Sequence, residues 1–399
     1  MPLKPDYPAG VMEEVMELML KYARQNMTYK EISLLLAKET NLQLGPDAIR
    51  KRLRRTGTQS RKGNTAHTVI EVKNIIQALL PDLPSTIGYR QMTCILRQKQ
   101  VNIPRDTVMK IMRELDPIGV DIRRRRRINR RIYRTMGPNH VWHVDGYDKL
   151  KPYGFPIHGC IDGFSRKILW LKVGPTNNDP EVIAFNFAQC VDELKGCPMV
   201  LQADPGTESG IMGSLQCLFR HTSNASFSGI RSYRVVRSIF NQRIEAWWSV
   251  MRRQQCEWWI SFFKDLVEFG GLHKGTINEM HCIRYCFMPL LQMDLDHLMD
   301  RWNNHYISHS RQAACPGGRP AVLYRLPEAS DFLGFQECLQ ALQEEDIAFA
   351  YAKTRLASRS GCPQFDIRAH AIFQQKGWDN ARSWQEALQQ YFIIVEMNL

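Results

Sequence analysis

The chain has 399 residues, enough for two or three domains, and its 44% hydrophobic and 23% charged residues exclude a globally disordered protein. Its net charge of +13 is unevenly distributed. Residues 1–139 contain 27 Lys and Arg against 13 Asp and Glu, whereas residues 140–399 contain 26 against 27. An excess confined to one third of the chain indicates that this third meets a polyanion such as nucleic acid.

No stretch approaches the roughly 18 apolar residues that a membrane span needs, and the first residues lack a signal-peptide core. We therefore expect a protein without a membrane partner that is not secreted: nuclear if the source is a eukaryote, otherwise cytoplasmic. The 11 scattered cysteines indicate reduced thiols. No zinc is expected, because the nearest cluster fits no zinc spacing: His273, His281, Cys282 and Cys286.

Residues 1–62 show apolar residues at helical spacing and predict a helix-turn-helix-like DNA-binding unit. Thr28 and Glu31 form a capping box for its second helix, and Gly45-Pro46-Asp47 starts its third. That third helix carries basic residues where a recognition helix meets phosphates and base edges: Arg50, Lys51, Arg52, Arg54 and Arg55. The alternative is a small helical bundle with a solvated basic face.

Residues 66–120 predict a second unit, with helices over 69–80, 88–99 and 104–115. Its stretch "IGYRQMTCILRQKQVNIPRDTVMKIMRELDPIGV" resembles the segment that precedes the catalytic core in bacterial insertion-sequence transposases with integrase-type cores. In those proteins a Gly-Tyr-Arg sequence, here Gly88-Tyr89-Arg90, opens a second helix-turn-helix-like unit. The resemblance implies the same kind of unit here.

Residues 121–138 are too densely charged to form a core element. Their arginines indicate a linker that binds the phosphates of nucleic acid. A nuclear-localisation signal is a compatible second use of the same residues. The basic residues expected to contact DNA here are Arg123, Arg124, Arg125, Arg126, Arg127, Arg130 and Arg131.

From residue 139 the pattern becomes that of an α/β core. "HVWHVDGYDKL" alternates like a strand, and "FPIHGCIDGFSRKILWLKV" predicts a hairpin in which Asp162 and Gly163 form the turn. A helix over 179–194, the buried strand "PMVLQAD" and a helix in "NQRIEAWWSVMRRQQCEWW" follow. In this order of elements, acids at strand ends and on a helix can converge.

Three acids occupy such positions: Asp145 on the first strand, Asp204 at the end of the buried strand, and Glu245 on the later helix. Mg²⁺ prefers carboxylate oxygens, and two ions roughly 4 Å apart stabilise the attacking and leaving oxygens of an in-line displacement. Each acid has a simpler alternative. Asp145 could be a solvated acid on an edge strand, and Asp204 a solvated acid in a turn. Glu245 could be a surface acid paired with Arg252 or Arg253.

The stretch from Trp142 to about Tyr324 resembles the retroviral-integrase-type DDE core, an RNase-H-like fold shared by integrases and many transposases. Asp145 in "WHVDGYDKL", Asp204 in "LQADPGTE" and Glu245 in "NQRIEAWW" match its three acids, with 58 and 40 residues between them. "IDGFSRKILWL" matches the family's hairpin, and "WNNHYISHSRQAACPGGRPAVLY" resembles the tail that closes many such cores. "DKLKPYG", "HGCIDGFSR" and the arginine run resemble transposon-derived integrase-core proteins of animal genomes.

The resemblance implies an RNase-H-like core over residues 139–327, a mixed five-stranded sheet flanked by helices. It implies a DNA-binding polynucleotidyl transferase in which Asp145, Asp204 and Glu245 hold two Mg²⁺ or Mn²⁺ ions for strand nicking and strand transfer. DNA is the implied partner, and a homo-oligomer on DNA is compatible with it. Glu208 and Asn241 are expected either to support the metal ligands or to face DNA.

Residues 328–399 predict a helical region, with helices over 347–356 and 384–392, and do not suggest the β-barrel that ends retroviral enzymes. The first third also lacks the two His and two Cys of the retroviral zinc module. Two alternatives to the DNA transferase stay open. One is a host-retained, transposon-derived DNA-binding or scaffold protein with a silent core, and the other is a nuclease that cleaves RNA in a hybrid.

Overall fold

The computed structural model describes residues 9–397 apart from residues 26, 41, 57–66, 84–86, 100, 102, 118–119, 121–132, 222–226, 274, 310–314 and 330–337. The contacts divide the chain into two compact units. The first comprises residues 1–132 and 304–333, and the second comprises residues 133–303 and 334–399. None of the helices in the described ranges is long and apolar enough to cross a membrane.

The first helices of the N-terminal unit pack as the sequence predicts: α1 (Ala9–Arg24), α2 (Tyr29–Thr40) and α3 (Pro46–Arg55). Their buried side chains, among them Ile32, Leu36 and Leu53, form one cluster. The predicted capping box is confirmed, because the backbone N–H of Thr28 donates to the Glu31 carboxylate and the N–H of Glu31 donates to Thr28 Oγ1. These three helices therefore have a core of their own.

A second set of helices in the same unit has a separate apolar cluster built around Val72, Ile76, Met92, Leu96 and Val108. Their bounds agree with the predicted helices to within a residue: α4 (Val69–Leu79), the short 3₁₀ turn η1 (Leu80–Asp82), α5 (Tyr89–Gln98) and α6 (Arg105–Leu115).

Residues 304–333 lie with the N-terminal unit, although the sequence-based limit of the core was residue 327. Val322 and Leu326, in and just after α13 (Pro320–Arg325), join the cluster of the first three helices. Lys38 Nζ donates to the Arg325 carbonyl at 2.9 Å, and Arg319 pairs with Glu31 at 2.9 Å. Apolar burial and these polar contacts explain why residues 304–333 belong to the N-terminal unit. The domain limits predicted from the sequence, at residues 62, 120, 138 and 327, stay predictions.

The second unit is built on a mixed five-stranded sheet in the order β3-β2-β1-β5-β6. β1 pairs antiparallel with β2 and parallel with β5, and β5 pairs parallel with β6. The predicted hairpin is confirmed, since β2 and β3 are antiparallel neighbours. The strands are β1 (Val141–Tyr147), β2 (Ile157–Asp162), β3 (Ile168–Val173), β5 (Val200–Ala203) and β6 (Tyr233–Val235).

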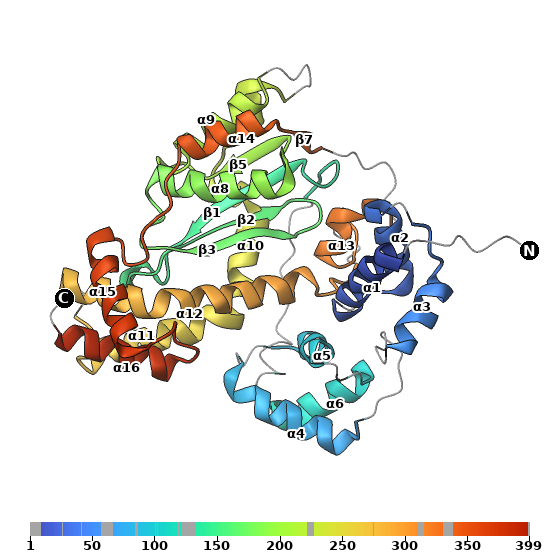
Figure 1. Cartoon of the computed structure of the whole chain (residues 1–399), viewed down its shortest axis with the longest axis horizontal. Coiled ribbons are helices and arrows are strands. Elements are labelled where there is room, and N and C mark those ends of the chain that lie inside the picture. Colours follow the sequence, from blue (N-terminus) through green and yellow to red (C-terminus); the bar gives the residue numbers. More distant parts are fainter. Residues whose placement is uncertain are drawn as a thin grey trace, which may run out of the picture. The chain divides into compact units, whose positions relative to one another are not determined.

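The two faces of the sheet are covered by different helices (Figure 1). One face, with Trp142 and Val144, packs against α8 (Pro180–Leu194) and α9 (Gly210–Phe219). The other, with Tyr147 and Ile161, packs against α10 (Gln242–Met251). Successive residues of β1 thus point to opposite cores, which follows from the period of a strand.

The predicted helix after residue 241 continues through a five-residue π-helical segment, η5 (Arg252–Cys256), into α11 (Glu257–Glu268). The 27-residue α12 (Ile277–Asn303) follows and packs on β3. The Asn303 side chain bonds both the backbone N–H and the carbonyl of Ile168, and so ties the end of α12 to the sheet.

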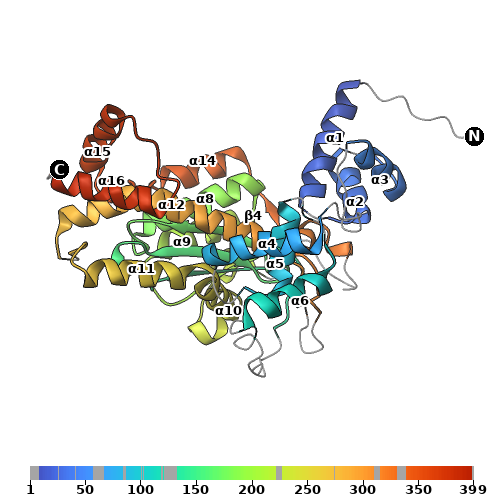
Figure 2. The same ribbon diagram turned by 90° about the horizontal axis from the view of Figure 1, so that it is seen from below.

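The C-terminal region is helical, as predicted, and belongs to the second unit. α15 (Pro363–Lys376) and α16 (Trp384–Glu396) lie beside α12 in both views (Figures 1 and 2). α14 (Glu344–Ala352) packs on α8, and a two-stranded antiparallel pair joins this region to the core: β4 (Gly196–Cys197) and β7 (Gln340–Ala341). The predicted helix over 347–356 begins and ends earlier than expected.

Asp162 is a structural acid in the hairpin turn, as predicted. Its carboxylate is fully buried and accepts hydrogen bonds from the backbone N–H groups of Asn139 and Ser165 at 2.8 Å and from the Ser165 hydroxyl at 2.7 Å. Replacing Asp162 by Ala leaves three buried donors without their acceptor. We expect the free energy of unfolding to fall by about 3 kcal/mol.

Urea unfolding checks this prediction, with Asp265→Ala on the exposed face of α11 as the control. Asp265→Ala should change the free energy of unfolding by less than about 0.5 kcal/mol. Equal losses for the two variants would refute the structural role of Asp162.

Candidate active site

The three acids come from neighbouring elements of the second unit. Asp145 lies on β1, and Asp204 directly follows β5, the parallel neighbour of β1. Glu245 lies in the first turn of α10, which packs across β1 and β2. Parallel strands bring their carboxyl ends to the same edge of a sheet, so the fold holds Asp145 and Asp204 near one edge, and Glu245 lies on the helix that packs across these strands.

The acids also influence one another electrostatically. Burial, helped by the charges of Asp204 and Glu245 and opposed by the hydrogen bonds from Trp248 and Gly146, raises the pKa of Asp145 to about 7. Burial, and then the charge of Asp204, raises the pKa of Glu245. Neighbouring negative charge therefore disfavours ionisation of Asp145 and of Glu245.

Trp248 is a direct partner of Asp145, a role that the sequence did not predict. Its indole Nε1 donates to Asp145 Oδ2 at 2.7 Å, and the Gly146 N–H donates to Asp145 Oδ1 at 2.8 Å. Gly159, opposite Asp145 on β2, leaves room for this indole, because a Cβ there would come within 2.8 Å of Trp248. Trp248 is three residues after Glu245 on α10, a spacing that places both on one helix face.

Because the Trp248 hydrogen bond stabilises the ionised carboxylate, Trp248→Phe should raise the pKa of Asp145 by roughly 1–2 pH units above about 7. Carboxyl ¹³C NMR titration without divalent ions measures this shift. Trp247→Phe makes the same ring change on the same helix without touching Asp145, and should leave that pKa in place. If the pKa of Asp145 stays at about 7 in Trp248→Phe, the hydrogen bond from Trp248 does not stabilise the ionised carboxylate.

Asn241 connects the elements that carry all three acids. Its fully buried amide Nδ2 donates to Asp204 Oδ1 at 3.1 Å and to the carbonyl of Val144, next to Asp145, at 2.9 Å. Its backbone carbonyl accepts the N–H of Glu245 at 3.2 Å. Asn241 is the N-cap residue of α10, yet its side chain makes no cap hydrogen bond and faces the sheet. Its burial favours the supporting role over contact with DNA.

His143 extends this network inward. His143 Nδ1 lies 2.7 Å from Asn241 Oδ1 and Nε2 lies 2.8 Å from the Tyr133 hydroxyl. Nδ1 also lies 3.2 Å from the Gln202 amide nitrogen, but the Asn241 oxygen is nearer and can only accept, so Nδ1 carries the proton and Nε2 accepts from Tyr133. Burial lowers the pKa of His143 to about 3, which keeps the ring neutral. His143 shares the alternation of β1 with Asp145, a signal that could have identified it from the sequence.

The remaining predicted site residues are Glu208 and the basic residues of α3 and of the linker. The Glu208 carboxylate packs directly against Gly206 in its own loop. Four basic side chains of α3 are exposed: Arg50, Lys51, Arg54 and Arg55. Arg52 is half-buried. Arg50 pairs with Asp47 at 2.9 Å. The linker arginines lie outside the described residues: Arg123, Arg124, Arg125, Arg126, Arg127, Arg130 and Arg131.

A divalent ion fits this donor set chemically. Across the described ranges, no three His, Cys, Asp or Glu side chains converge in an arrangement ready to hold a metal ion. Asp145 instead faces Trp248 and Gly146, and Asp204 accepts from Ser238 and Asn241. Carboxylates are nevertheless the oxygen donors that Mg²⁺ or Mn²⁺ prefers, and a cation would relieve the repulsion that helps to raise the pKa of Asp145 and Glu245. Holding an ion requires these side chains to turn toward one another.

Residues 132–317 match the family model of the integrase core domain. The chain carries an integrase core domain. The match includes all three acids, Asn241 and the sheet, and it confirms the RNase-H-like fold expected from the sequence. An integrase core makes the chain integrase- or transposase-like, and proteins of this family usually use divalent metals. No curated protein matches the chain.

Proposed function

We propose that the chain is a DNA-binding polynucleotidyl transferase of the DDE type, in which Asp145, Asp204 and Glu245 hold two Mg²⁺ or Mn²⁺ ions. The observation that carries the proposal is the shared electrostatic environment of these acids within an integrase core: burial, together with the charges of the other two acids, raises the pKa of Asp145 to about 7. A buried acid whose pKa is strongly raised, with further acids on neighbouring elements, is typical of functional sites.

The protein's own groups would mainly position and stabilise charge. Trp248 donates to Asp145 and favours its ionised form, while Asn241 fixes Asp204 relative to β1. Bound divalent ions would supply a water of lowered pKa and stabilise charge on the reacting phosphate oxygens. The acids then serve as ligands, and the reaction needs no protein nucleophile.

The basic helices of the N-terminal unit would bind the DNA. α3 presents Arg50, Lys51, Arg54 and Arg55 to solvent, as expected of a recognition helix that meets phosphates and base edges. The arginine-rich linker adds sequence-independent attraction to the backbone. These contacts would supply DNA affinity, and the integrase core would supply the chemistry.

The proposal is tested by nicking of supercoiled plasmid and by strand transfer between oligonucleotide duplexes, both with Mn²⁺. Asp204→Asn should lower the nicking rate by at least about 100-fold relative to the parent. Asp265→Asn, an exposed change on α11, should keep the parent rate. A parent that is inactive on every DNA offered, or an equally active Asp204→Asn, would end the catalytic proposal.

A second candidate is a transposon-derived DNA-binding or scaffold protein with a silent core. The observation that favours it is that no ready-made metal cluster occurs in the part of the chain that the structure describes. This candidate predicts DNA binding without Mn²⁺ binding at the three acids. Metal titration therefore separates the two candidates.

A further inference from the structure

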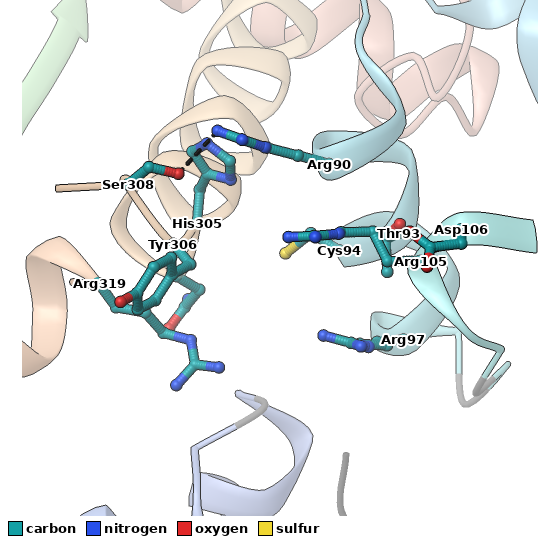
Figure 3. Close-up of a pocket in the computed structure, with 11 residues that line it drawn as sticks. Arg90, Thr93, Cys94, Arg97, Arg105, Asp106, His305, Tyr306, Ser308 and Arg319 are labelled. Atoms are coloured by element: carbon teal, nitrogen blue, oxygen red, sulfur yellow. Dashed lines mark hydrogen bonds between the residues drawn. The ribbon is translucent and has the colours of Figure 1, made fainter. Parts of the chain in front are cut away.

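The N-terminal unit contains a polar pocket that no part of the proposed reaction uses. Its volume is about 480 Å³, within the range of small-ligand sites. Figure 3 shows side chains from α5 and the start of α6 reaching toward the segment that carries His305, Tyr306 and Arg319. All of these residues belong to one compact unit.

The lining of the pocket is strongly cationic. Among the described residues, one carboxylate lines it, that of Asp106, and four arginines: Arg90, Arg97, Arg105 and Arg319. Arg319 also pairs with Glu31 at 2.9 Å, which offsets part of its charge. Burial, together with the charges of Arg90 and Arg319, lowers the pKa of His305 to about 4. The histidine therefore stays neutral near pH 7 in a positive field.

Several of the guanidinium groups are held in place before any ligand arrives. The Arg319 side chain is only 2% exposed and is anchored by Glu31. Arg90 Nη1 donates to the Ser308 hydroxyl at 2.8 Å. The guanidinium carbons of Arg90 and Arg105 lie 5.8 and 6.0 Å from the centre of the Tyr89 ring. Such contacts reduce the side-chain entropy that binding would otherwise remove.

The start of α6 adds to the same potential. Arg105 and Asp106 form its first turn, and the N-cap residue Pro104 has no side-chain cap hydrogen bond. Backbone N–H groups at a helix N-terminus favour anions. The carboxylate of Asp106 offsets part of the positive charge of the helix N-terminus and the arginines, but the arginines outnumber it.

We propose that this pocket binds a small phosphate-bearing anion, such as a phosphomonoester or a pyrophosphate. The planar guanidinium fork matches the oxygens of a phosphate group and can bind it through two parallel hydrogen bonds. A hollow with several arginines around it suits a compact anion with more than one negative charge. The proposal does not depend on the activity of the three acids.

Calorimetric titration of the full chain with sodium pyrophosphate tests this proposal, at fixed ionic strength and without divalent ions. We expect one pyrophosphate to bind per chain. The double variant Arg90→Gln/Arg105→Gln should bind it roughly 100-fold more weakly, since each lost charged hydrogen bond is worth roughly tenfold. Both residues are exposed, so the fold should tolerate the changes.

Arg113→Gln is the matched control, because Arg113 is an exposed arginine of α6 outside the pocket lining. It should leave pyrophosphate affinity unchanged. The single variants Arg90→Gln and Arg105→Gln are compared with it. If Arg113→Gln weakens pyrophosphate binding as much as either of them, only overall charge matters and the proposal is overturned. Failure of the parent to bind pyrophosphate would also overturn it. If the parent binds no pyrophosphate and the Arg90→Gln and Arg105→Gln changes weaken binding of duplex DNA, the pocket holds a phosphate of the DNA backbone and not a small anion.

Discussion

Replacing Asn241 by Ala is expected to weaken Mn²⁺ binding at the three acids by about 10–100-fold, the usual effect of removing a group that orients a metal ligand. Asn241 is fully buried and donates both to Asp204 and to the carbonyl next to Asp145. Without its amide, Asp204 loses its connection to β1 and His143 loses its acceptor. The ligands then have to be ordered at the moment of binding.

Asn303→Ala is the matched control, since Asn303 also bonds the backbone of a strand, at Ile168, but contacts none of the three acids. Calorimetry with Mn²⁺ and urea unfolding should be carried out on both variants. We expect both to be less stable than the parent, and only Asn241→Ala to lose metal affinity. Equal Mn²⁺ affinity in the two variants would contradict a positioning role for Asn241.

Asp145→Asn should make the metal-free protein more stable above pH 7 while abolishing its metal-dependent activity. The folded pKa of Asp145, about 7, lies above its ordinary value of 3.8. The folded state therefore retains a proton that the unfolded state releases, and the stability it contributes is full below pH 3.8 and lost as pH rises through about 7. At 1.36 kcal/mol per pH unit, the interval corresponds to up to about 4 kcal/mol.

Urea unfolding at pH 5 and pH 8 without divalent ions measures this effect. Asp145→Asn should gain stability relative to the parent mainly at pH 8, whereas the exposed Asp265→Asn should show no such pH-dependent gain. A variant no more stable than the parent at pH 8 would mean that Asp145 is not destabilised by its surroundings. Stability gained by removing a functional charge is the usual trade-off at active sites.

Much of the core could be predicted because its signals are local. The alternation around Asp145 and the apolar run before Asp204 each specify a strand that the structure contains. β6 escaped prediction because it is a three-residue strand with little buried surface, defined by its pairing with β5. The π-helical segment also escaped, since the helical pattern runs through it without interruption. The placement of residues 304–333 rests on contacts with helices almost 300 residues earlier.

The candidate site was only partly accessible to sequence reasoning. Its three acids were identified by their spacing and by resemblance, and their assignment as metal ligands stays a prediction. The contacts that orient them depend on tertiary packing: Trp248 reaches Asp145 across 103 residues, and Asn241 reaches His143 across 98. Helix spacing from Glu245 and strand alternation from Asp145 were the available hints.

Calorimetric titration of the full chain with Mn²⁺ tests most directly whether the three acids hold divalent ions together. We expect the parent to bind Mn²⁺ with release of protons at pH 6, because Asp145 is still protonated there. Asp145→Asn, Asp204→Asn and Glu245→Gln should each abolish most of the binding, and Asp265→Asn should not. A parent that binds no Mn²⁺, or acid variants that bind it as tightly as the parent, would contradict the proposal.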